Sequence, residues 1–379
     1  MTAVSVWHSV LNLWKSLRTF QGRSGFLVGP DVNLIFIKGL QTPFQLVNRV
    51  IQNLIIRGRG EFRYPKIWLG QTQAYWIRAN LRLYEMLEEE TFLTLAIRTG
   101  NALVLRQKEG WWKSNLIGLS NRLDVIHNTL IANSLFDLYE LTGDKRYMES
   151  VLTYDDVLNK RIGFTYLDDG SAFVRYFSGG KKEFVCNANT LVLSFLGRLT
   201  KVGYSRKEVI KSLLKALSNS MLENGELPYD ACFTLHYQCT QYNAFELMDL
   251  IEYQYYSSGN DAEKLIDKIA RWLASRVTPE GYVWYQCNKM FPLITYHHTA
   301  TLAALSAAHT HIHFNECLQK KNSRLLKFCL ERQMRNGLFE YGYFRPSFHD
   351  RGSYLRPNCI ILKNLADFMF FGSSHINLN

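Results

Sequence analysis

Apolar residues recur along the chain with the spacing of amphipathic helices, and pairs of such stretches are joined by short polar turns. Within residues 122–160, Ile131, Leu135 and Leu138 form one stripe, and a second stripe follows the Thr-Gly-Asp turn at 142–144. Side chains three or four residues apart share one face of a helix, whereas strands alternate every second residue. We therefore predict antiparallel helical hairpins, with glycine ending the first helix and Asp or Ser capping the second. No alternating run is long enough to predict a sheet domain.

A weak internal repeat places a glycine, followed by aromatic residues, at the end of each hairpin. Five glycines mark it at steps of 53, 62, 56 and 56 residues: Gly110, Gly163, Gly225, Gly281 and Gly337. Gly60, in GRGEFRY, is a degenerate sixth copy. Units of this kind bury their apolar faces by stacking on their neighbours. The predicted fold class is therefore all-α, with a repeat of about 56 residues.

The hairpins follow one another without a Pro- or Ser-rich linker, which predicts a single domain over residues 1–379. We expect residues 1–42 to form an N-terminal extension, and the helices near 43–57 and 358–371 to pair and close a ring. Closure removes the two end faces that an open solenoid, the alternative architecture, must cap. The complete hairpins are expected near 71–106, 122–160, 187–221, 240–276 and 295–334.

Polar and aromatic residues gather in the longer connections between hairpins, whereas the short turns leave little room for a site. Loops on a rigid scaffold often carry function, and these connections would meet at one end of a ring. Aromatic rings stack on sugar faces, while carboxylates and arginines bind hydroxyl and carboxylate groups. The substrate-binding residues that we expect at this end are Trp112, Asp168, Arg175, Asn243, Tyr282, Trp284, Tyr285, Arg345 and Arg351.

The net charge and the cysteine content limit the classes of binding partner and the cellular compartment that we expect. The net charge of +11 is consistent with nucleic acid, anionic lipid or acidic polysaccharide, but Lys and Arg are dispersed, which disfavours nucleic acid. The expected partner is a small-molecule or oligosaccharide substrate, including anionic ones. The seven cysteines lack CxxC spacing and indicate reduced thiols, and the N-terminal segment lacks a secretion signal. We therefore expect a cytoplasmic protein without a membrane span. The stripe formed by Trp7, Leu11, Trp14 and Leu17 is expected in the core, with weak membrane-surface contact as the alternative.

The sequence resembles the six-hairpin α/α-toroid superfamily in the segments LYELTGDKRYMES, ENGELPYD, LIEYQYYSSGNDAEKLIDKIARWL and PEGYVWY. The resemblance spans the repeat over residues 71–345 and implies a closed (α/α)6 toroid. Carbohydrate-active members of this superfamily include uronate epimerases, polysaccharide lyases, N-acylglucosamine epimerases and unsaturated glucuronyl hydrolases. The stretch YDACFTLHYQCTQYNAFELMDL also looks like the Tyr- and His-rich helix entry of glucuronyl carbon-5 epimerases. The resemblance implies a carbohydrate-active enzyme and carries over no individual catalytic residue.

Proton abstraction beside a sugar carboxylate, in an epimerase or a lyase, is the chemistry that these residue types favour. It needs a base, an acid and a cation that holds the carboxylate, and we assign the last role to Arg345. Glycoside hydrolysis is the first alternative, with Asp230 and Glu340 as catalytic carboxylates. The catalytic candidates for proton abstraction are His236, Tyr237, Tyr296, His297 and Tyr341.

Two further alternatives stay open. A terpene or prenyl cyclase would use an aromatic-lined cavity to stabilise cations, although the DxDD and repeated QW motifs are absent. A non-catalytic glycan-binding or scaffold protein would need no acid or base. In HTHIH, a helix would place His309 and His313 on one face and His311 on another, so we expect no metal site. The absence of P-loop, GxGxxG, GxSxG and CxxC motifs predicts that the protein uses no cofactor.

Overall fold

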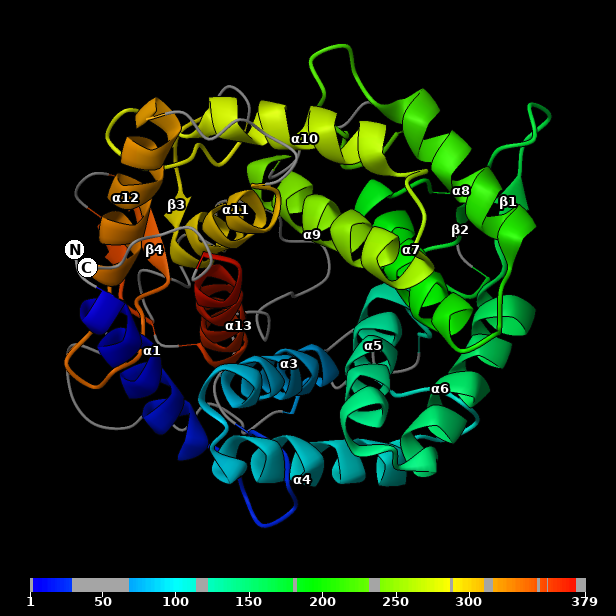
Figure 1. The fold of residues 1–379 in the computed structure, drawn as a ribbon, viewed down its shortest axis with the longest axis horizontal. Helices are drawn as coiled ribbons and strands as arrows, with labels where there is room; N and C mark the ends of the chain where they lie inside the picture. The colour runs from blue at the N-terminus through cyan, green and yellow to red at the C-terminus, as the bar shows by residue number, and fades with distance from the viewer. Residues whose placement is uncertain are drawn as a thin grey trace.

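The structure, a computed structural model, is mostly helical and forms a ring of two helical layers (Figure 1). It describes residues 3–28, 68–113, 122–179, 183–231, 239–286, 289–309, 316–345, 348–352 and 354–372. Gly60 and the helix expected near 43–57 lie outside these residues. In the described part of the chain, no helix is both long and apolar enough to cross a membrane.

The inner layer consists of helices that surround the ring axis. They are α3 (Gly70–Leu87), α5 (Val125–Thr142), α7 (Cys186–Lys201), α9 (Cys239–Ser257), α11 (Thr295–Ala307) and α13 (Leu355–Gly372). Each inner helix contacts the next along the chain, and α13 contacts α3, so the series of contacts returns to its start. Helix α11 is buried along its whole length, which explains why its sequence has no polar face.

The outer layer runs antiparallel to the inner one. It comprises α1 (Ala3–Arg18), α4 (Glu90–Arg106), α6 (Lys145–Val157), α8 (Lys207–Ser220), α10 (Glu263–Arg276) and α12 (Glu316–Leu330), and a π-helical turn, Leu158–Ile162, extends α6. Outer helices are one-sided: α8 buries Ile210, Leu213 and Leu217 against the inner layer and exposes its lysines. The short turns therefore lie at the C-terminal ends of the inner helices, and the long connections lie at their N-terminal ends.

Helix α1 belongs to this outer layer and contacts α13. The sequence predicts an extension over residues 1–42, and the structure corrects this for Ala3–Arg18. Ser9 Oγ donates to Gln333 Oε1 at 2.6 Å, and Gln333 Nε2 donates to Ser9 O at 2.8 Å. Trp14 Nε1 donates to Asn80 Oδ1 of α3 at 2.9 Å. The stripe that includes Trp14 and Leu17 therefore packs in the core.

The repeated glycines adopt left-handed backbone conformations and pack against the next outer helix. A Cβ at Gly25 would lie 2.6 Å from Arg98 O, and one at Gly225 would lie 2.6 Å from Lys268 O. Gly163 is an exception and has more open surroundings. The close approach requires glycine because any side chain would collide with backbone. The copies with positive φ are Gly25, Gly110, Gly163, Gly225, Gly281 and Gly337.

An amide side chain in the first turn of most inner helices holds the incoming connection. Asn128 Oδ1 accepts from Trp112 N at 2.7 Å, while its Nδ2 donates to Asp124 O at 2.9 Å. The same position donates and accepts in three other helices, where Asn189, Asn243 and Asn358 bind the N–H groups of Val174, Leu227 and Phe339. In α3 the residue is Gln73, and in α11 it is His298, whose Nδ1 lies 2.7 Å from Ile294 O. We call these contacts the entry clasps.

The Thr-Gly-Asp turn has the predicted caps, since Gly143 is left-handed and Asp144 accepts from Arg146 N. The turn after α9 differs: Ser258, not Gly259, takes the positive φ, and no side chain caps α10. Small β-sheets form within the long connections. Strand β1 (Phe164–Tyr166) pairs with β2 (Ala172–Val174), and β4 (Gly342–Arg345) lies between β3 (Leu293–Ile294) and β5 (Phe348–Asp350), all antiparallel.

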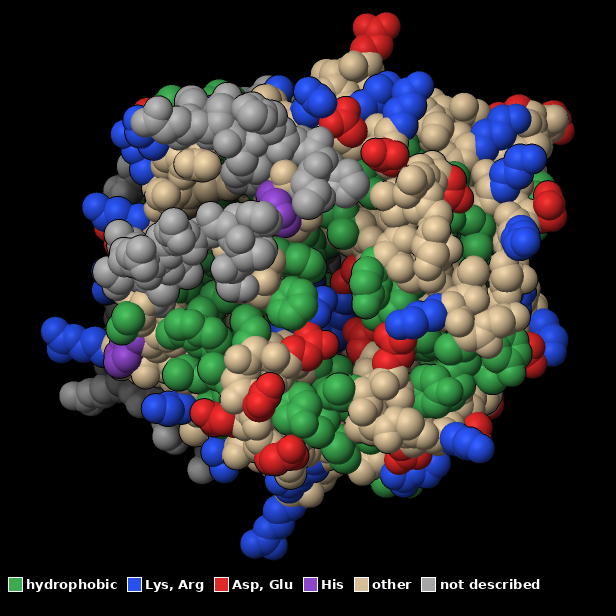
Figure 2. All heavy atoms as spheres, viewed as in Figure 1, with side chains coloured by type: hydrophobic (Ala, Val, Ile, Leu, Met, Phe, Trp, Pro, Cys, Tyr) green, Lys and Arg blue, Asp and Glu red, His purple; other side chains and the backbone are tan. Residues whose placement is uncertain are grey.

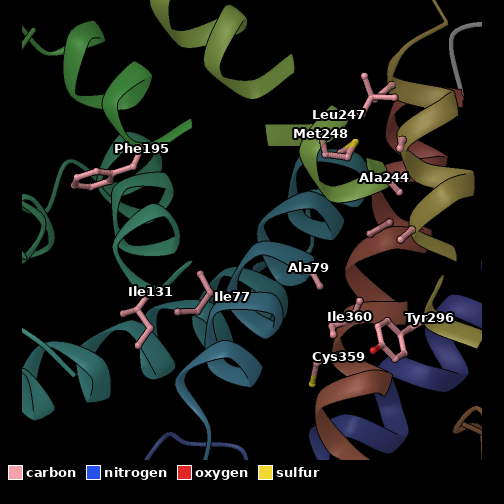
Figure 3. Close-up of a cluster of buried hydrophobic side chains, with 14 of the residues drawn as sticks. Ile77, Ala79, Ile131, Phe195, Ala244, Leu247, Met248, Tyr296, Cys359 and Ile360 are labelled. Atoms are coloured by element: carbon pink, nitrogen blue, oxygen red, sulfur yellow. The ribbon is translucent and has the colours of Figure 1, made fainter. Parts of the chain in front are cut away.

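The hydrophobic core fills the space between the layers and between neighbouring inner helices. Figure 3 shows Ile77 of α3 beside Ile131 of α5, and Tyr296 of α11 beside Ile360 of α13. Ile77 and Ile131 are fully buried, and burial of such a side chain contributes about 1.5–3 kcal/mol. The core therefore fixes the positions of the inner helices, and with them the side chains that point to the axis.

Candidate active site on the ring axis

Polar side chains follow the axis-facing side of the inner helices at intervals of about one helical turn. On α3 the series is Tyr75, Arg78 and Arg82, and α9 contributes Asp249 and Glu252. A buried charge without a partner costs several kcal/mol, so such a series must be paired or neutral. The contacts separate into three layers along the axis, which we call the mouth layer, the paired layer and the reactive layer.

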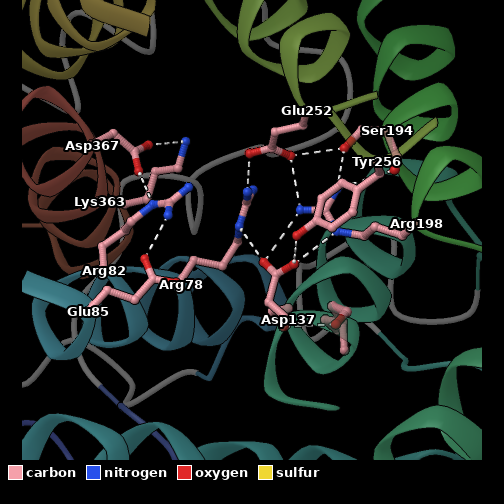
Figure 4. A network of polar contacts seen from close by, with 12 residues as sticks. Arg78, Arg82, Glu85, Asp137, Ser194, Arg198, Glu252, Tyr256, Lys363 and Asp367 are labelled. Carbon is pink, nitrogen blue, oxygen red and sulfur yellow. Dashed lines mark hydrogen bonds and ion pairs between the residues drawn. The ribbon is translucent and has the colours of Figure 1, made fainter. Parts of the chain in front are cut away.

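The paired layer consists of Arg78, Asp137, Arg198 and Glu252, one from each of α3, α5, α7 and α9 (Figure 4). Arg78 Nε lies 3.1 Å from Asp137 Oδ2, and Arg78 also pairs with Glu252. Arg198 lies 2.9 Å from Asp137 and 3.1 Å from Glu252. Burial alone would raise the pKa of Glu252, but the two arginines outweigh burial and hold it well below its ordinary value. Glu252 is therefore ionised, and both of its carboxylate oxygens accept hydrogen bonds.

The mouth layer consists of Arg82, Lys363 and Asp367, near the C-terminal ends of α3 and α13. Lys363 Nζ lies 2.6 Å from Asp367 Oδ2, and Arg82 Nε lies 3.3 Å from Asp367 Oδ1. The guanidinium of Arg82 also lies over the ring of Phe370, 4.1 Å from its centroid. Cations near helix C-termini are favoured by the helix dipoles.

A cavity of about 450 Å³ adjoins these two layers at the short-turn end of the ring. Its walls are charged groups of the two layers together with Tyr255, Tyr256, Phe370 and Phe371. On the face drawn in Figure 2, acidic, basic and hydrophobic side chains surround a hollow near the centre. The sequence led us to expect little room at the short turns. The cavity lies between the helix ends, inside the turns, which explains the difference.

The reactive layer consists of Tyr75, Thr190 and Asp249, one turn closer to the N-terminal ends of the inner helices. Thr190 Oγ1 donates to Asp249 Oδ2 at 3.1 Å. Burial, and then the charge of Glu252, raise the pKa of Asp249 to about 8, although Arg78, Lys363 and the Thr190 hydrogen bond oppose the shift. Asp249 keeps partial solvent exposure, although it is not among the residues that line the cavity.

Tyr75 joins this layer to a guanidinium on α13. Burial, and then the charge of Asp249, raise the pKa of Tyr75 to about 12, while Arg356 and Arg78 act in the opposite direction. Arg356 Nη1 donates to Gln71 Oε1 at 3.2 Å, in the first turn of α3. The phenol of Tyr75 therefore lies within electrostatic range of both a carboxyl group of raised pKa and an arginine. This combination can move a proton beside an anionic group.

Three of the catalytic candidates from the sequence form one aromatic cluster with Tyr285. His297 lies 4.6 Å from Tyr296 and 5.6 Å from Tyr285, centroid to centroid, and Tyr296 lies 6.2 Å from Tyr341. Burial holds the pKa of His297 well below its ordinary value, and neither ring nitrogen has a hydrogen-bond partner. His297 is therefore neutral in the folded protein. Only Tyr285 of this group keeps partial exposure.

The other expected residues have different surroundings. Trp112 is fully buried, with Nε1 donating to Leu103 O, and Asn243 forms an entry clasp, so both already have structural roles. Asp230 and Glu340 are buried in the long connections, and Glu340 bonds to the hydroxyl of Tyr343. His236, Tyr237 and the side chain of Arg345 lie outside the described part of the structure.

Five expected residues line the outer parts of the long connections. Asp168 is exposed in the turn between β1 and β2, and Arg351 is exposed after β5. Arg175 Nε donates to Thr165 Oγ1 at 3.4 Å. Tyr282 lies 6.0 Å from Phe328 of α12, centroid to centroid. Trp284 is half-buried, and its carbonyl oxygen accepts from Thr240 Oγ1. These residues are dispersed around the rim, so the structure does not bring them into one group with the reactive layer.

We did not predict the reactive layer from the sequence, because we expected functional residues in the connections and not within the helices. A signal was available: charged residues recur every three or four positions within otherwise apolar helices, as in Arg78 and Arg82 of α3 or Asp249 and Glu252 of α9. Such a polar stripe on the inner side of a ring indicates a lined cavity. Among the described residues, no group of three His, Cys, Asp or Glu side chains could hold a metal ion.

No model of a known protein family and no curated protein matches the sequence. Solved structures do match. An unsaturated glucuronyl hydrolase specific for heparin superposes with a TM-score of 0.62 at 12% identity, covering 99% of this chain and 98% of that one. Cellobiose 2-epimerase from Bacillus thermoamylovorans gives 0.61 at 12% identity, covering 78% and 87%. The type II terpene cyclase MstE from Scytonema gives 0.59 at 10% identity, covering 96% and 97%.

Other matching structures include an α-1,6-mannanase and a polysaccharide lyase. At these identities the likeness shows the fold alone. It agrees with the observed order of inner and outer helices and with the resemblance that the sequence carries. The protein is thus a mostly helical chain whose structural neighbours include (α/α)6 toroid-type carbohydrate enzymes and a terpene cyclase.

Proposed function

We propose that the protein is a carbohydrate-active enzyme that abstracts a proton beside the carboxylate of an acidic saccharide, as an epimerase or a lyase does. The observation that carries this proposal is the reactive layer, where Tyr75 lies in electrostatic range of both Asp249 and Arg356. The scaffold would be a ring of six hairpins, of which α1 and α13 form the sixth. The neighbours' folds are compatible with this chemistry and do not select it.

Asp249 is the proposed base. A catalytic base works best when its pKa lies near the working pH, and the pKa of Asp249 is about 8. Tyr75 is the proposed acid, because a phenol with a pKa of about 12 keeps its proton until the transition state needs it. Asp249 would take the proton from the carbon beside the carboxylate. Tyr75 would then deliver a proton either to that carbon from the other face, in an epimerase, or to the departing oxygen, in a lyase.

Arg356 is the proposed partner of the substrate carboxylate. A guanidinium offers two parallel donors to a carboxylate, and negative charge that develops on that group during proton abstraction would be stabilised by it. The N-terminal ends of the inner helices point toward the same end of the ring. Their dipoles add partial positive charge there, which also favours an anionic ligand.

Glycoside hydrolysis is the weaker candidate for this layer. It needs a protonated carboxyl group and a free carboxylate on either side of the scissile bond. Asp249 fits the first role. Glu252 and Asp137 are the ionised groups nearby, but each is bound by both arginines of the paired layer, and Glu252 also accepts from Ser194 Oγ at 2.9 Å. Carboxylates held in this way are poor bases.

The test is a panel of uronate-containing and neutral oligosaccharides, followed by absorbance of unsaturated products and by deuterium uptake from solvent. On a substrate found in this way, Asp249→Asn and Tyr75→Phe should each reduce turnover by about 100-fold or more, the usual size for loss of an acid or base. Tyr204→Phe, at an exposed tyrosine after α7 that does not line the cavity, is the matched control and should keep full activity.

The pH dependence adds a second criterion. A base acts in its ionised form, so kcat/KM should rise with pH up to about 8 and then level off. Full activity of Asp249→Asn would exclude this assignment. Turnover of neutral glycans alone would favour the hydrolase, binding of a polyprenyl substrate instead of a saccharide would favour the cyclase, and saccharide binding without any turnover would favour a binding module.

A further inference from the structure

Two carboxyl groups lie one turn apart on α9, and they differ in their hydrogen-bond partners. Asp249 and Glu252 are three positions apart, a spacing that brings side chains of a helix close together. Glu252 accepts from both arginines of the paired layer and from Ser194. The one hydrogen bond that the described residues give to Asp249 comes from the hydroxyl of Thr190.

Neighbouring carboxyl groups resist ionising together, and the better-solvated or better-paired one ionises first. Glu252 has two cationic partners, so it carries the negative charge, and its charge then disfavours a second one on Asp249. The arginines fix the position of that charge, because each is also bound to Asp137. The contrast between the two groups follows from these contacts alone.

We propose that Glu252, held between Arg78 and Arg198, is a positioning residue that makes Asp249 a stronger base, and that Lys363 opposes it. This inference rests on the proposed role of Asp249 as the catalytic base. It goes further in assigning the paired layer a function in the reaction besides its role in holding four helices together.

The groups around Asp249 can be named helix by helix. Helix α3 presents Tyr75 and Arg78, α7 presents Thr190 and Arg198, and α13 presents Lys363. On α9 itself, Glu246 is fully buried one turn earlier, and burial followed by the charge of Asp249 raises its pKa well above the ordinary value, so it adds no negative charge. Helix α11 carries Tyr296, His297 and His298, and burial lowers the pKa of both histidines, so they add no charge. The charges of α10 lie on its outer, exposed side.

Each neighbouring charge shifts the pKa of Asp249 in a known direction. The charge of Glu252 raises the pKa of Asp249, whereas Lys363 and Arg78 lower it, all after the larger effect of burial. Removing Glu252 should therefore weaken the base, and removing Lys363 should strengthen it. Asp137 pairs with the same two arginines from α5, but it is not among the main influences on Asp249. It provides a matched control inside the same network.

The test follows the titration of Asp249 directly, by carbon-13 NMR of the protein labelled at aspartate and free of saccharide. Asp249→Asn identifies the signal. Glu252→Gln should lower the apparent pKa by about one unit or more, and Lys363→Gln should raise it, as loss of a nearby charge does. Asp137→Asn should shift it less than half as far as Glu252→Gln. If Glu252→Gln does not fold, the upward shift in Lys363→Gln decides the question.

An unchanged titration in Glu252→Gln, or a downward shift in Lys363→Gln, would overturn the inference. Because no substrate is present, this result is independent of whether the protein turns over any saccharide. On an active substrate, the pH at which kcat/KM reaches half its plateau should move with the NMR titration in each variant. A shifted titration together with an unshifted pH profile would keep Glu252 as an electrostatic partner of Asp249 and would remove its catalytic significance, which also overturns the inference.

Discussion

Toward the C-terminal ends of the inner helices, from the level of Arg78 and Glu252 onward, charges are buried in pairs. The turns on the N-terminal side of that level hold amides and single titratable groups. In the first region, Arg78 and Arg198 each bridge the same two carboxylates, so every charge has two partners. In the second, entry clasps satisfy the backbone, and Asp249 has one neutral hydrogen-bond partner. Both regions tie neighbouring helices together. Only the second leaves a proton-accepting group whose state can change near neutral pH.

This difference suggests that the two regions have separate roles along the ring axis. Ion pairs between four helices resist movement, but their members are poor acids and bases because their charges are fixed. A group that exchanges protons must have fewer charged partners than the members of an ion pair. It also needs rigid surroundings that hold it in position. The paired layer would supply those surroundings one turn away from Asp249. The following substitutions test the contrast by stability, independently of activity.

The largest loss is expected from Arg198→Met. Arg198 is almost fully buried, and its removal leaves Asp137 and Glu252 with one arginine between them. Breaking a buried ion pair by removing one partner costs about 3–5 kcal/mol. Urea unfolding monitored by circular dichroism would measure this change in the free energy of unfolding.

Arg271→Met is the matched control, because Arg271 makes an exposed ion pair with Asp267 on the outer face of α10. Exposed pairs contribute little to stability, so this variant should be indistinguishable from the parent. If the two variants lost the same stability, the distinction between a paired interior and a solvated exterior would fail.

A smaller loss is expected from Asn128→Ala. The change leaves the N–H of Trp112 and the carbonyl of Asp124 without their partner, and each unsatisfied buried group costs about 1–3 kcal/mol. Asn187→Ala is the comparison, because Asn187 also lies in the first turn of an inner helix but is half-buried and its Oδ1 has no partner. Equal melting temperatures of these two variants would show that the clasp contributes nothing.

The smallest change is expected from His298→Asn, which restores the amide found at the equivalent position of other inner helices. Asparagine can bond to Ile294 O, but the stacking on Phe328, now 4.5 Å away, is lost. We expect a change within about 1 kcal/mol at neutral pH.

The pH dependence of His298→Asn should differ more clearly. Burial lowers the pKa of His298 from 6.5 to about 3, so the unfolded chain binds a proton that the folded protein does not. This penalty is absent above pH 6.5 and grows as the pH falls toward 3. Melting curves between pH 7 and 4 should therefore show a shallower loss of stability in the variant. A steeper loss would mean that the clasp depends on the imidazole.

Helical periodicity was a good guide to the scaffold. The helices α5 and α6 span 125–157, where the sequence predicted a hairpin over 122–160, because a strong apolar stripe and a Gly-Asp turn leave few alternatives. Gly25 was overlooked, since it is followed by Phe and Leu but lies 85 residues before Gly110, outside the regular step. The periodicity of a repeat cannot locate a copy that is separated by a long insertion.

The site was harder to predict because the relevant neighbours come from different repeats. Tyr75 and Asp249 are far apart in the chain, and Asp249 stands at the helical end of the Tyr- and His-rich stretch, beyond the entry on which the prediction rested. Their proximity depends on ring geometry, and the shifted pKa of Asp249 depends on burial and on Glu252, neither of which spacing reveals. Tyr296 and His297 were expected at a catalytic site, and in the structure their rings pack on each other inside a buried cluster. Local composition indicates where polar residues gather and does not indicate which of them lack a partner.

Helix α1 has a consequence for how the protein is made. Its apolar face, which includes Val10 and Leu13, is covered in the finished structure partly by α13, more than three hundred residues later in the chain. Ribosomes add roughly 5–20 residues per second, so α1 would wait on the order of tens of seconds for that partner. During this time the intermediate hairpins can stack in order and Trp14 can pack on α3 and α4, while the part of α1 that α13 covers stays exposed. Contacts between such distant segments slow folding, and an unpaired apolar helix invites self-association or capture by a chaperone until the last turn of α13 has left the ribosome.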